Sequence, residues 1–170
     1  MYFTSYLKYA GVFVLLILLQ VTFIGFFLSI PNYNITPDIV ILFVIYLGYT
    51  RGHIPGMISG FLSGIVLDFL SGSFIGLTAL SYCISGFTAG YFNRQLSEGS
   101  NRKNSFLIII FICTLIAYTI FYIIYFQGTS ISYSEIFIKH ILTTSLYTLV
   151  FGLIFAFFLS RFEKKNSFIV

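Results

Sequence analysis

The chain has 170 residues, enough for one compact unit, and its composition excludes an ordinary water-soluble domain. Hydrophobic residues make up 58% of the chain and charged residues only 8%, against roughly 25% charged residues in soluble proteins. The nine Lys and Arg residues outnumber the five Asp and Glu residues, but they stand singly or in pairs at the ends of apolar runs, which argues against nucleic acid as a partner and for a membrane protein.

Six apolar segments separated by short polar loops predict an all-α integral membrane protein, with six transmembrane helices in one compact bundle over residues 1–170. The predicted helices, in chain order, comprise residues 9–30, 37–50, 54–70, 74–92, 106–126 and 135–160. The first segment is longer than the apolar region of a usual signal peptide and lacks a small-residue cleavage site. We therefore expect it to be retained as a helix.

The basic residues predict that both termini lie in the cytoplasm. With the N-terminus inside, eight of the nine basic residues fall on the cytoplasmic side, which follows the positive-inside rule. These eight are Lys8, Arg51, Arg94, Arg102, Lys103, Arg161, Lys164 and Lys165. Only Lys139 falls outside, and it follows Glu135 by four residues, a spacing that allows an ion pair on a helix.

The second predicted helix is short. At ~1.5 Å per residue, residues 37–50 span about 21 Å, whereas the hydrocarbon core is ~30 Å thick. Either this helix spans a locally thinned bilayer, or the second and third segments form a re-entrant hairpin. The hairpin would place Arg51 deep in the membrane at a cost of roughly 2.5–3.5 kcal/mol or more, so the short spanning helix is favoured.

Small residues recur every fourth position in the third segment, and an acid and a glycine continue the spacing: Gly52, Gly56, Gly60, Gly64, Asp68 and Gly72. Each step of four drifts by only about 40° around a helix, so Gly56, Gly60, Gly64 and Asp68 share one face. Small faces let helix backbones approach closely in membranes. We therefore expect the third helix at the centre of the bundle, with its glycines used for internal packing or for a partner helix.

Asp68 is interpreted as the one acid inside the apolar part of a segment, and two roles are open for it. It is either a structural carboxylate that accepts hydrogen bonds from Ser71, Ser73 or the backbone of the turn 71–73, or a contact for a partner or ligand. The sequence shows no nucleophile motif, no metal-ligand spacing and no second acid at useful distance. We expect no catalysis, no metal and no cofactor.

The ordered motifs between residues 36 and 92 resemble the MreD family of rod shape-determining proteins. The matching positions include Pro37, Asp38, Arg51, Gly52, Gly56, Gly60, Gly64, Asp68, Gly72 and Gly76. The resemblance implies a multi-pass protein of the bacterial inner membrane that belongs to the cell-elongation machinery. It implies an MreC-like bitopic protein as partner, together with MreB, peptidoglycan polymerases and membrane lipids, and it implies no catalytic residues.

The MreD family is also similar in architecture to the vitamin-binding subunits of energy-coupling-factor transporters, and such a subunit is the alternative interpretation. Those subunits usually carry an Ala-xxx-Ala face on their first helix, which the sequence around Gly11 and Leu15 lacks. They bind vitamins through polar outer loops. Here the corresponding loops are short, with Asn32, Asn34 and Gln127 as the candidate ligand contacts.

Overall fold

The computed structural model describes residues 11, 13–24, 36–96, 102–128 and 133–166 of the chain, and these residues contain helices and turns but no strand. An apolar helix over Phe13–Thr22 overlaps a π-helical turn, η1 (Gln20–Ile24). The further elements are α3 (Ile39–Arg51), α4 (His53–Ser71), α5 (Leu77–Leu96), α6 (Arg102–Tyr125), α7 (Tyr133–Ile136), η2 (Phe137–Leu142) and α8 (Thr143–Asn166). The predicted all-α class is confirmed for the described residues.

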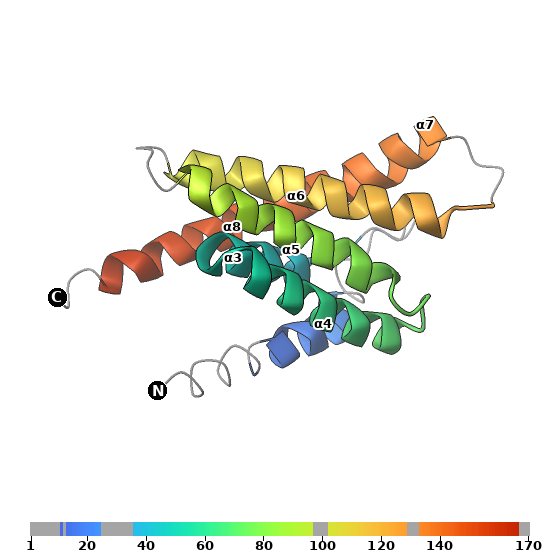
Figure 1. Ribbon diagram of the computed structural model, residues 1–170, viewed down its shortest axis with the longest axis horizontal. Coiled ribbons are helices and arrows are strands. Elements are labelled where there is room, and N and C mark those ends of the chain that lie inside the picture. The colour runs from blue at the N-terminus through green and yellow to red at the C-terminus, as the bar shows by residue number, and fades with distance from the viewer. Residues whose placement is uncertain (1–10, 12, 25–35, 97–101, 129–132, 167–170) are drawn as a thin grey trace.

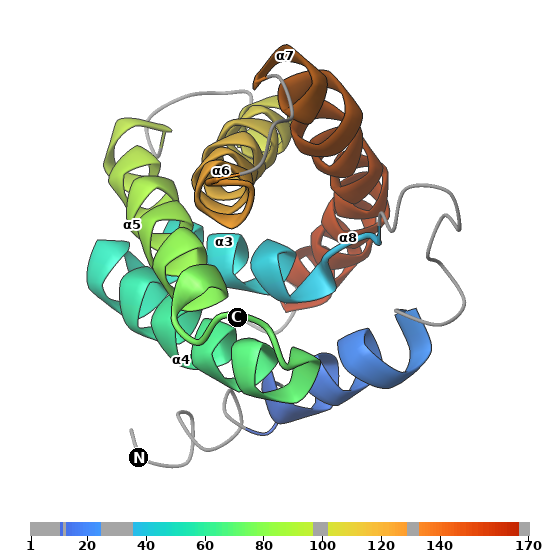
Figure 2. The ribbon, with the colours of Figure 1, turned by 90° about the vertical axis from the view of Figure 1, so that its right-hand side faces the viewer.

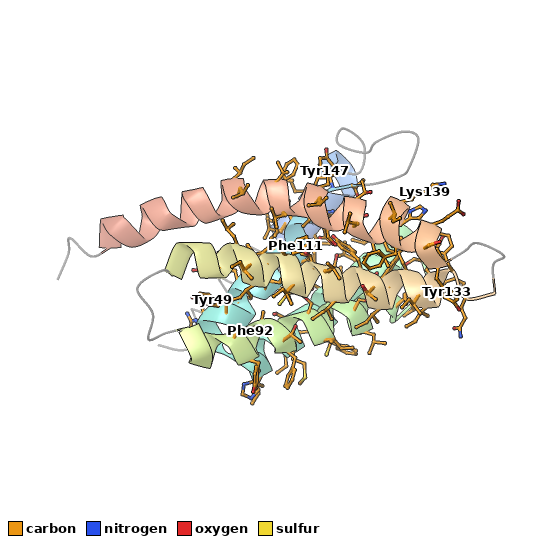
Figure 3. The ribbon with its side chains drawn as sticks, turned by 90° about the horizontal axis from the view of Figure 1, so that it is seen from above. Tyr49, Phe92, Phe111, Tyr133, Lys139 and Tyr147 are labelled. Carbon is orange, nitrogen blue, oxygen red and sulfur yellow. The ribbon has the colours of Figure 1, made fainter. Side chains whose placement is uncertain are left out.

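The helices run alternately between two ends of an elongated bundle (Figure 1). One end, here called the Arg51 end, carries the turn between α3 and α4, the end of α5 and the start of α6. The opposite end, called the Asp68 end, carries the turn between α4 and α5 and the start of α7. Tyr49 and Phe92 lie toward the first end, and Tyr133 and Lys139 lie at the second (Figure 3).

Several boundaries differ from the predicted ones for local reasons. Helix α5 begins at Leu77 rather than at residue 74, because Gly72 and Gly76 adopt positive φ values of 65° and 100° and extend the turn. The last predicted helix consists of α7, η2 and α8 in succession and reaches Asn166. Of the first predicted helix, residues 9, 10, 12 and 25–30 lie outside the described residues.

Within the described residues, three helical stretches are long and apolar enough to cross a membrane: His53–Ser71, Phe106–Tyr125 and Tyr133–Ile154. Two shorter apolar helices, Phe13–Thr22 and Ile39–Arg51, accompany them. Helix α5 does not belong to this set, and it packs against α3, α4 and α6. Enclosure by three neighbours lets a helix of lower apolarity lie inside such a bundle.

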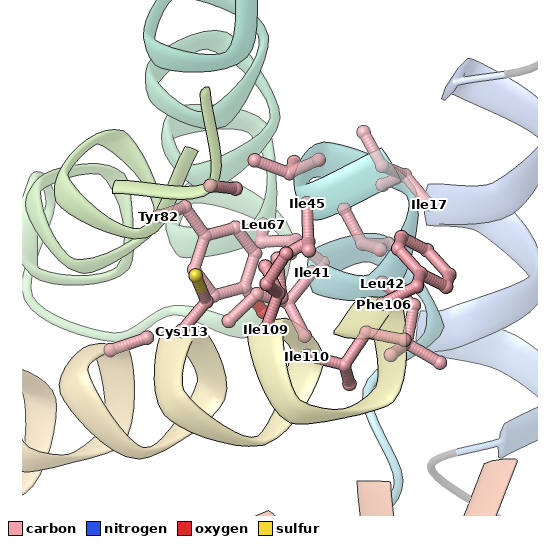
Figure 4. Packing of buried hydrophobic residues seen from close by; sticks show 14 residues of the cluster. Ile17, Ile41, Leu42, Ile45, Leu67, Tyr82, Phe106, Ile109, Ile110 and Cys113 are labelled. Carbon is pink, nitrogen blue, oxygen red and sulfur yellow. The ribbon is translucent and has the colours of Figure 1, made fainter. Parts of the chain in front are cut away.

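The centre of the bundle is α3 with α5, and the expectation that the third predicted helix lies there is wrong. Every residue from Val40 to Val44 in α3 is buried, and α3 contacts α4, α5, α6 and α8. Its side chains pack on Phe106, Ile109 and Ile110 of α6 (Figure 4). A helix that is apolar on all sides is buried on all sides, whereas a glycine stripe specifies contact on only one face.

The position of α3 also removes the reason to invoke a thinned bilayer. Figure 2 shows α3 enclosed by the other helices rather than at the rim of the bundle. Its 13 residues cover about 20 Å, less than the ~30 Å hydrocarbon core. Because protein rather than lipid surrounds it, its ends need not reach both membrane surfaces, and its polar backbone groups can be satisfied inside the protein.

The glycines of α4 contact the backbone of α5. A Cβ atom added at Gly60 would overlap the backbone of Tyr82, and one added at Gly64 would overlap the backbone of Ala79. Gly56 meets Gly86 in the same way. The opposite face of α4 is exposed and apolar, with exposed side chains at Ile54, Ile58, Phe61, Leu62, Phe69 and Leu70. Helix α4 therefore lies at the rim of the bundle, with its glycine face turned inward.

Candidate functional site

Asp68 is fully buried at the end of α4 and holds the start of α5. Its Oδ2 accepts hydrogen bonds from the backbone N–H groups of Gly76 at 2.8 Å, Thr78 at 3.2 Å and Ala79 at 3.4 Å. Its Oδ1 accepts from the hydroxyl of Ser73 at 3.1 Å and again from the Thr78 N–H. The first N–H groups of a helix have no partner within the helix, so Asp68 acts as a cap supplied by the preceding helix.

These contacts correspond to the structural interpretation of Asp68, although the donors differ in part from those expected. Ser73 is a donor, as considered, but Ser71 donates to the carbonyl oxygen of Leu67 and to Ser73 instead. The backbone donors come from the start of α5 and not from the turn 71–73. Within the described structure, all these donors belong to the chain's own turn and helix.

A second buried acid lies inside the bundle, at a position that the sequence interpretation named only as a matching motif residue. Asp38 is only 7% exposed, so Asp68 is not the one buried acid. Asp38 caps α3, because its Oδ1 accepts from the Ile41 N–H at 3.0 Å, and its Oδ2 accepts from the hydroxyl of Tyr82 in α5. The short second segment could have indicated this burial. A helix of this length does not cross the whole membrane, so when one of its ends lies at a membrane surface, the other end lies inside the bundle.

Five side chains from different parts of the chain form one polar cluster around Asp38, here called the Asp38 network: Gln20, Asp38, Tyr82, Tyr118 and Thr148. The backbone N–H of Asp38 donates to the Thr148 hydroxyl at 3.4 Å, and that hydroxyl lies 3.2 Å from the Tyr118 hydroxyl. Gln20 donates to the carbonyl oxygen of Pro37 at 2.9 Å and accepts from the Ile39 N–H at 3.0 Å. The network thus links η1, α3, α5, α6 and α8.

A partly open cavity of about 200 Å³ adjoins the Asp38 network on the side of the Asp68 end. Its walls combine one carboxylate, several hydroxyl groups and aromatic rings, including Asp38, Ser81, Tyr82, Tyr118, Phe121 and Tyr122. Among the described residues that line it, none is Lys, Arg or His. The cavity therefore offers hydrogen-bond acceptors, aromatic faces and a single negative group.

The other predicted positions fall into separate places. Arg51 is exposed at the end of α3, and Gly52 forms the turn to α4 with a φ of 97°. Pro37 is buried beside Asp38, whereas Gly72 and Gly76 form the turn above Asp68. In the described part of the chain, no group of three His, Cys, Asp or Glu residues gathers where it could hold a metal ion. The arrangement is suited to binding and to helix packing.

A bundle that is all-helical in its described residues, with helices long and apolar enough to cross a membrane, defines the class: a helical membrane protein. A family model described as rod shape-determining protein MreD matches residues 3–166. The chain belongs to this family, which confirms the resemblance and extends it from residues 36–92 to nearly the whole chain. Membership makes it a cell-shape protein of the rod complex. Neither a curated protein nor a solved structure matches the chain.

Proposed function

We propose that the protein is a non-catalytic, six-pass component of the bacterial inner membrane that partners an MreC-like bitopic protein in the rod complex. Through this partner it would link MreB filaments to sidewall peptidoglycan polymerases and so control cell shape. The observation that carries the proposal is the family match over residues 3–166. The two buried acids are held by hydrogen bonds within the chain, an arrangement that fits a scaffold or binding protein.

The proposed topology has both termini in the cytoplasm. Six helical segments alternate between the two ends of the bundle, counting Phe13–Thr22 as the first and α7 through α8 as the last. Arg51, the last residues of α5 and the first residues of α6 share one end. At the opposite end, Lys139 is paired with Glu135 at 3.4 Å, which offsets its charge. The positive-inside rule then assigns the Arg51 end to the cytoplasm.

A partner helix would meet a surface other than the glycine face. Gly56, Gly60 and Gly64 already contact α5, so that face is occupied inside the chain. The large apolar side chains on the rim of α4, among them Ile58 and Leu62, are open to lipid or to another helix. We propose that the glycines act indirectly, because they fix the position of this outer face.

The vitamin-transporter alternative gains no support from the cavity. Pockets that enclose drug-sized ligands usually measure roughly 300–1,000 Å³. The cavity beside Asp38 measures about 200 Å³ and is too small for a ligand of that size without rearrangement.

The test is depletion of the protein in its rod-shaped host, with cell width measured by microscopy. We expect round, wide cells, and restoration of the rod shape by a plasmid copy but not by the empty plasmid. In parallel, affinity capture of the tagged full chain from membranes should recover an MreC-like protein in comparable amount. Normal shape combined with impaired vitamin uptake would replace the proposal with the transporter alternative.

A further inference from the structure

The cavity beside Asp38 holds an acidic group that no cation among the described lining residues balances. Asp38 is buried, and none of the described residues that line the cavity is Lys, Arg or His. A buried carboxylate requires compensation by hydrogen bonds and opposite charge, or it takes up a proton. The N-terminus of α3 supplies about half a positive charge at Asp38, so a substantial negative charge is left over in the ionised form.

Asp38 contributes a carboxylate to the wall of the cavity. Its closest hydrogen bonds come from the Ile41 N–H and the Tyr82 hydroxyl, and the Val40 N–H and the Tyr118 hydroxyl interact with it more weakly. A cation in the cavity would be attracted to Asp38 by its charge, because no described residue of the lining is a cation.

Aromatic rings form much of the remaining wall. Tyr82, Tyr118, Phe121 and Tyr122 all line the cavity. The faces of aromatic rings attract ammonium groups, and a carboxylate next to such rings adds a charge-assisted hydrogen bond. A hard divalent cation would need about six oxygen ligands, usually with several carboxylates, and the lining provides one. An anion would find no basic residue in this lining.

We propose that this cavity binds an ammonium group, carried by a small free amine or by the amino headgroup of a lipid. The ammonium donates to Asp38, and the aromatic rings enclose its carbon substituents. A volume of about 200 Å³ equals that of roughly six or seven water molecules at about 30 Å³ each, enough for an ethanolamine-sized group. The inference rests on the cavity and not on the proposed role in cell shape, so either can fail without the other.

The primary test uses the purified full chain in nanodiscs of phosphatidylglycerol, a lipid without an amine. Ethanolamine and methylamine, both protonated at neutral pH, are titrated in saturation-transfer NMR, with ethylene glycol as the uncharged probe of similar size. We expect saturable binding of both ammonium probes and none of ethylene glycol. Asp38→Asn should weaken ammonium binding by about tenfold or more, because it removes the charge while keeping size and one acceptor oxygen.

Two further variants keep the test decisive if Asp38→Asn folds poorly. Phe121→Leu removes an aromatic face without touching the Asp38 network, and it should weaken binding by about threefold or more. Glu135→Gln removes one negative charge from the exposed surface at the same end of the bundle and should leave binding unchanged. Size-exclusion profiles establish that each variant is folded.

A second experiment with lipids distinguishes a free amine from a lipid headgroup as the source of the ammonium group. The protein is reconstituted with phosphatidylglycerol and phosphatidylethanolamine, extracted gently, and its retained lipids are identified by mass spectrometry. Retention of phosphatidylethanolamine by the wild type but not by Asp38→Asn identifies a lipid headgroup, whereas ethanolamine binding without such retention identifies a free amine. Absence of ammonium binding in every arm, or equal binding by wild type, Asp38→Asn and Phe121→Leu, would overturn the proposal.

Discussion

Replacement of Asp68 by leucine should unfold the junction between α4 and α5. The leucine removes the acceptor for three backbone N–H groups at the start of α5, those of Gly76, Thr78 and Ala79. Each buried donor left without a partner costs about 1–3 kcal/mol. Since the adjoining turn is partly exposed and can relax, we expect a total loss of about 3–5 kcal/mol, the range seen when one partner of a buried charged pair is removed.

Replacement of Asp68 by asparagine should be much milder. The amide oxygen can occupy the position of Oδ2, where it still accepts from Gly76, Thr78 and Ala79. The amide NH₂ then takes the position of Oδ1 and donates to the Ser73 hydroxyl, which reverses its role. The loss consists of the charge assistance of these bonds and of the second contact of the Thr78 N–H, which an NH₂ group at the Oδ1 position cannot accept, about 1–2 kcal/mol in total.

The assay is the free energy of unfolding of the purified chain in mixed micelles, followed by circular dichroism and by size exclusion. Stability should fall in the order wild type, Asp68→Asn, Asp68→Leu. Glu135→Leu is the control, because Glu135 is 54% exposed and its loss should change stability by about 0.5 kcal/mol or less. If Asp68→Asn folds normally yet fails to restore rod shape, the charge of Asp68 has a functional role and this reasoning fails.

Two further predictions follow from the packing and from the topology. Gly60→Ala should lower stability by about 1–2 kcal/mol because its Cβ overlaps the Tyr82 backbone. Gly152→Ala, whose Cβ would lie 3.3 Å from side-chain methyl groups of Ile110 and Leu42 and not on backbone, should cost clearly less in the same unfolding assay. Equal stability of the two variants would contradict close packing of α4 on α5. Topology reporters fused at the C-terminus and after Gly128 should report cytoplasm and periplasm respectively, and a periplasmic C-terminus would exclude the six-pass arrangement.

The class of fold and the order of the helices were predictable because they depend on composition and on local pattern. Apolar runs bounded by turn residues identify helices, and the four-residue spacing of Gly56, Gly60 and Gly64 identifies a face for close contact. The glycine spacing does not specify whether lipid or protein surrounds the other faces of α4. The large apolar residues between the glycines fit lipid as well as protein, so the rim position of α4 followed only from the structure.

The burial of Asp38, which the sequence interpretation named only as a motif position, escaped prediction for a related reason. Its position at the start of a segment made it resemble a residue at a membrane surface, where an acid before a helix is an ordinary cap. The distance along the chain to Tyr82 and Thr148 is long, so no local pattern links these residues. The length of α3 was the one local clue, because a 13-residue helix that ends at Arg51 begins inside the bundle, at Asp38.

The two buried acids differ in their hydrogen-bond partners and in their position relative to the cavity. This difference indicates a structural role for Asp68 and a binding role for Asp38. Asp68 receives hydrogen bonds from four donor groups, three of them backbone N–H groups of Gly76 and the start of α5, and it is not among the residues that line the cavity. Asp38 receives close hydrogen bonds from Ile41 and Tyr82 and weaker ones from Val40 and Tyr118, and it lines the cavity. An acid away from any cavity stabilises a junction, whereas an acid in a cavity wall can also attract a cation from outside. Substitution of Asp68 should therefore act mainly on folding, and substitution of Asp38 on what the folded protein binds.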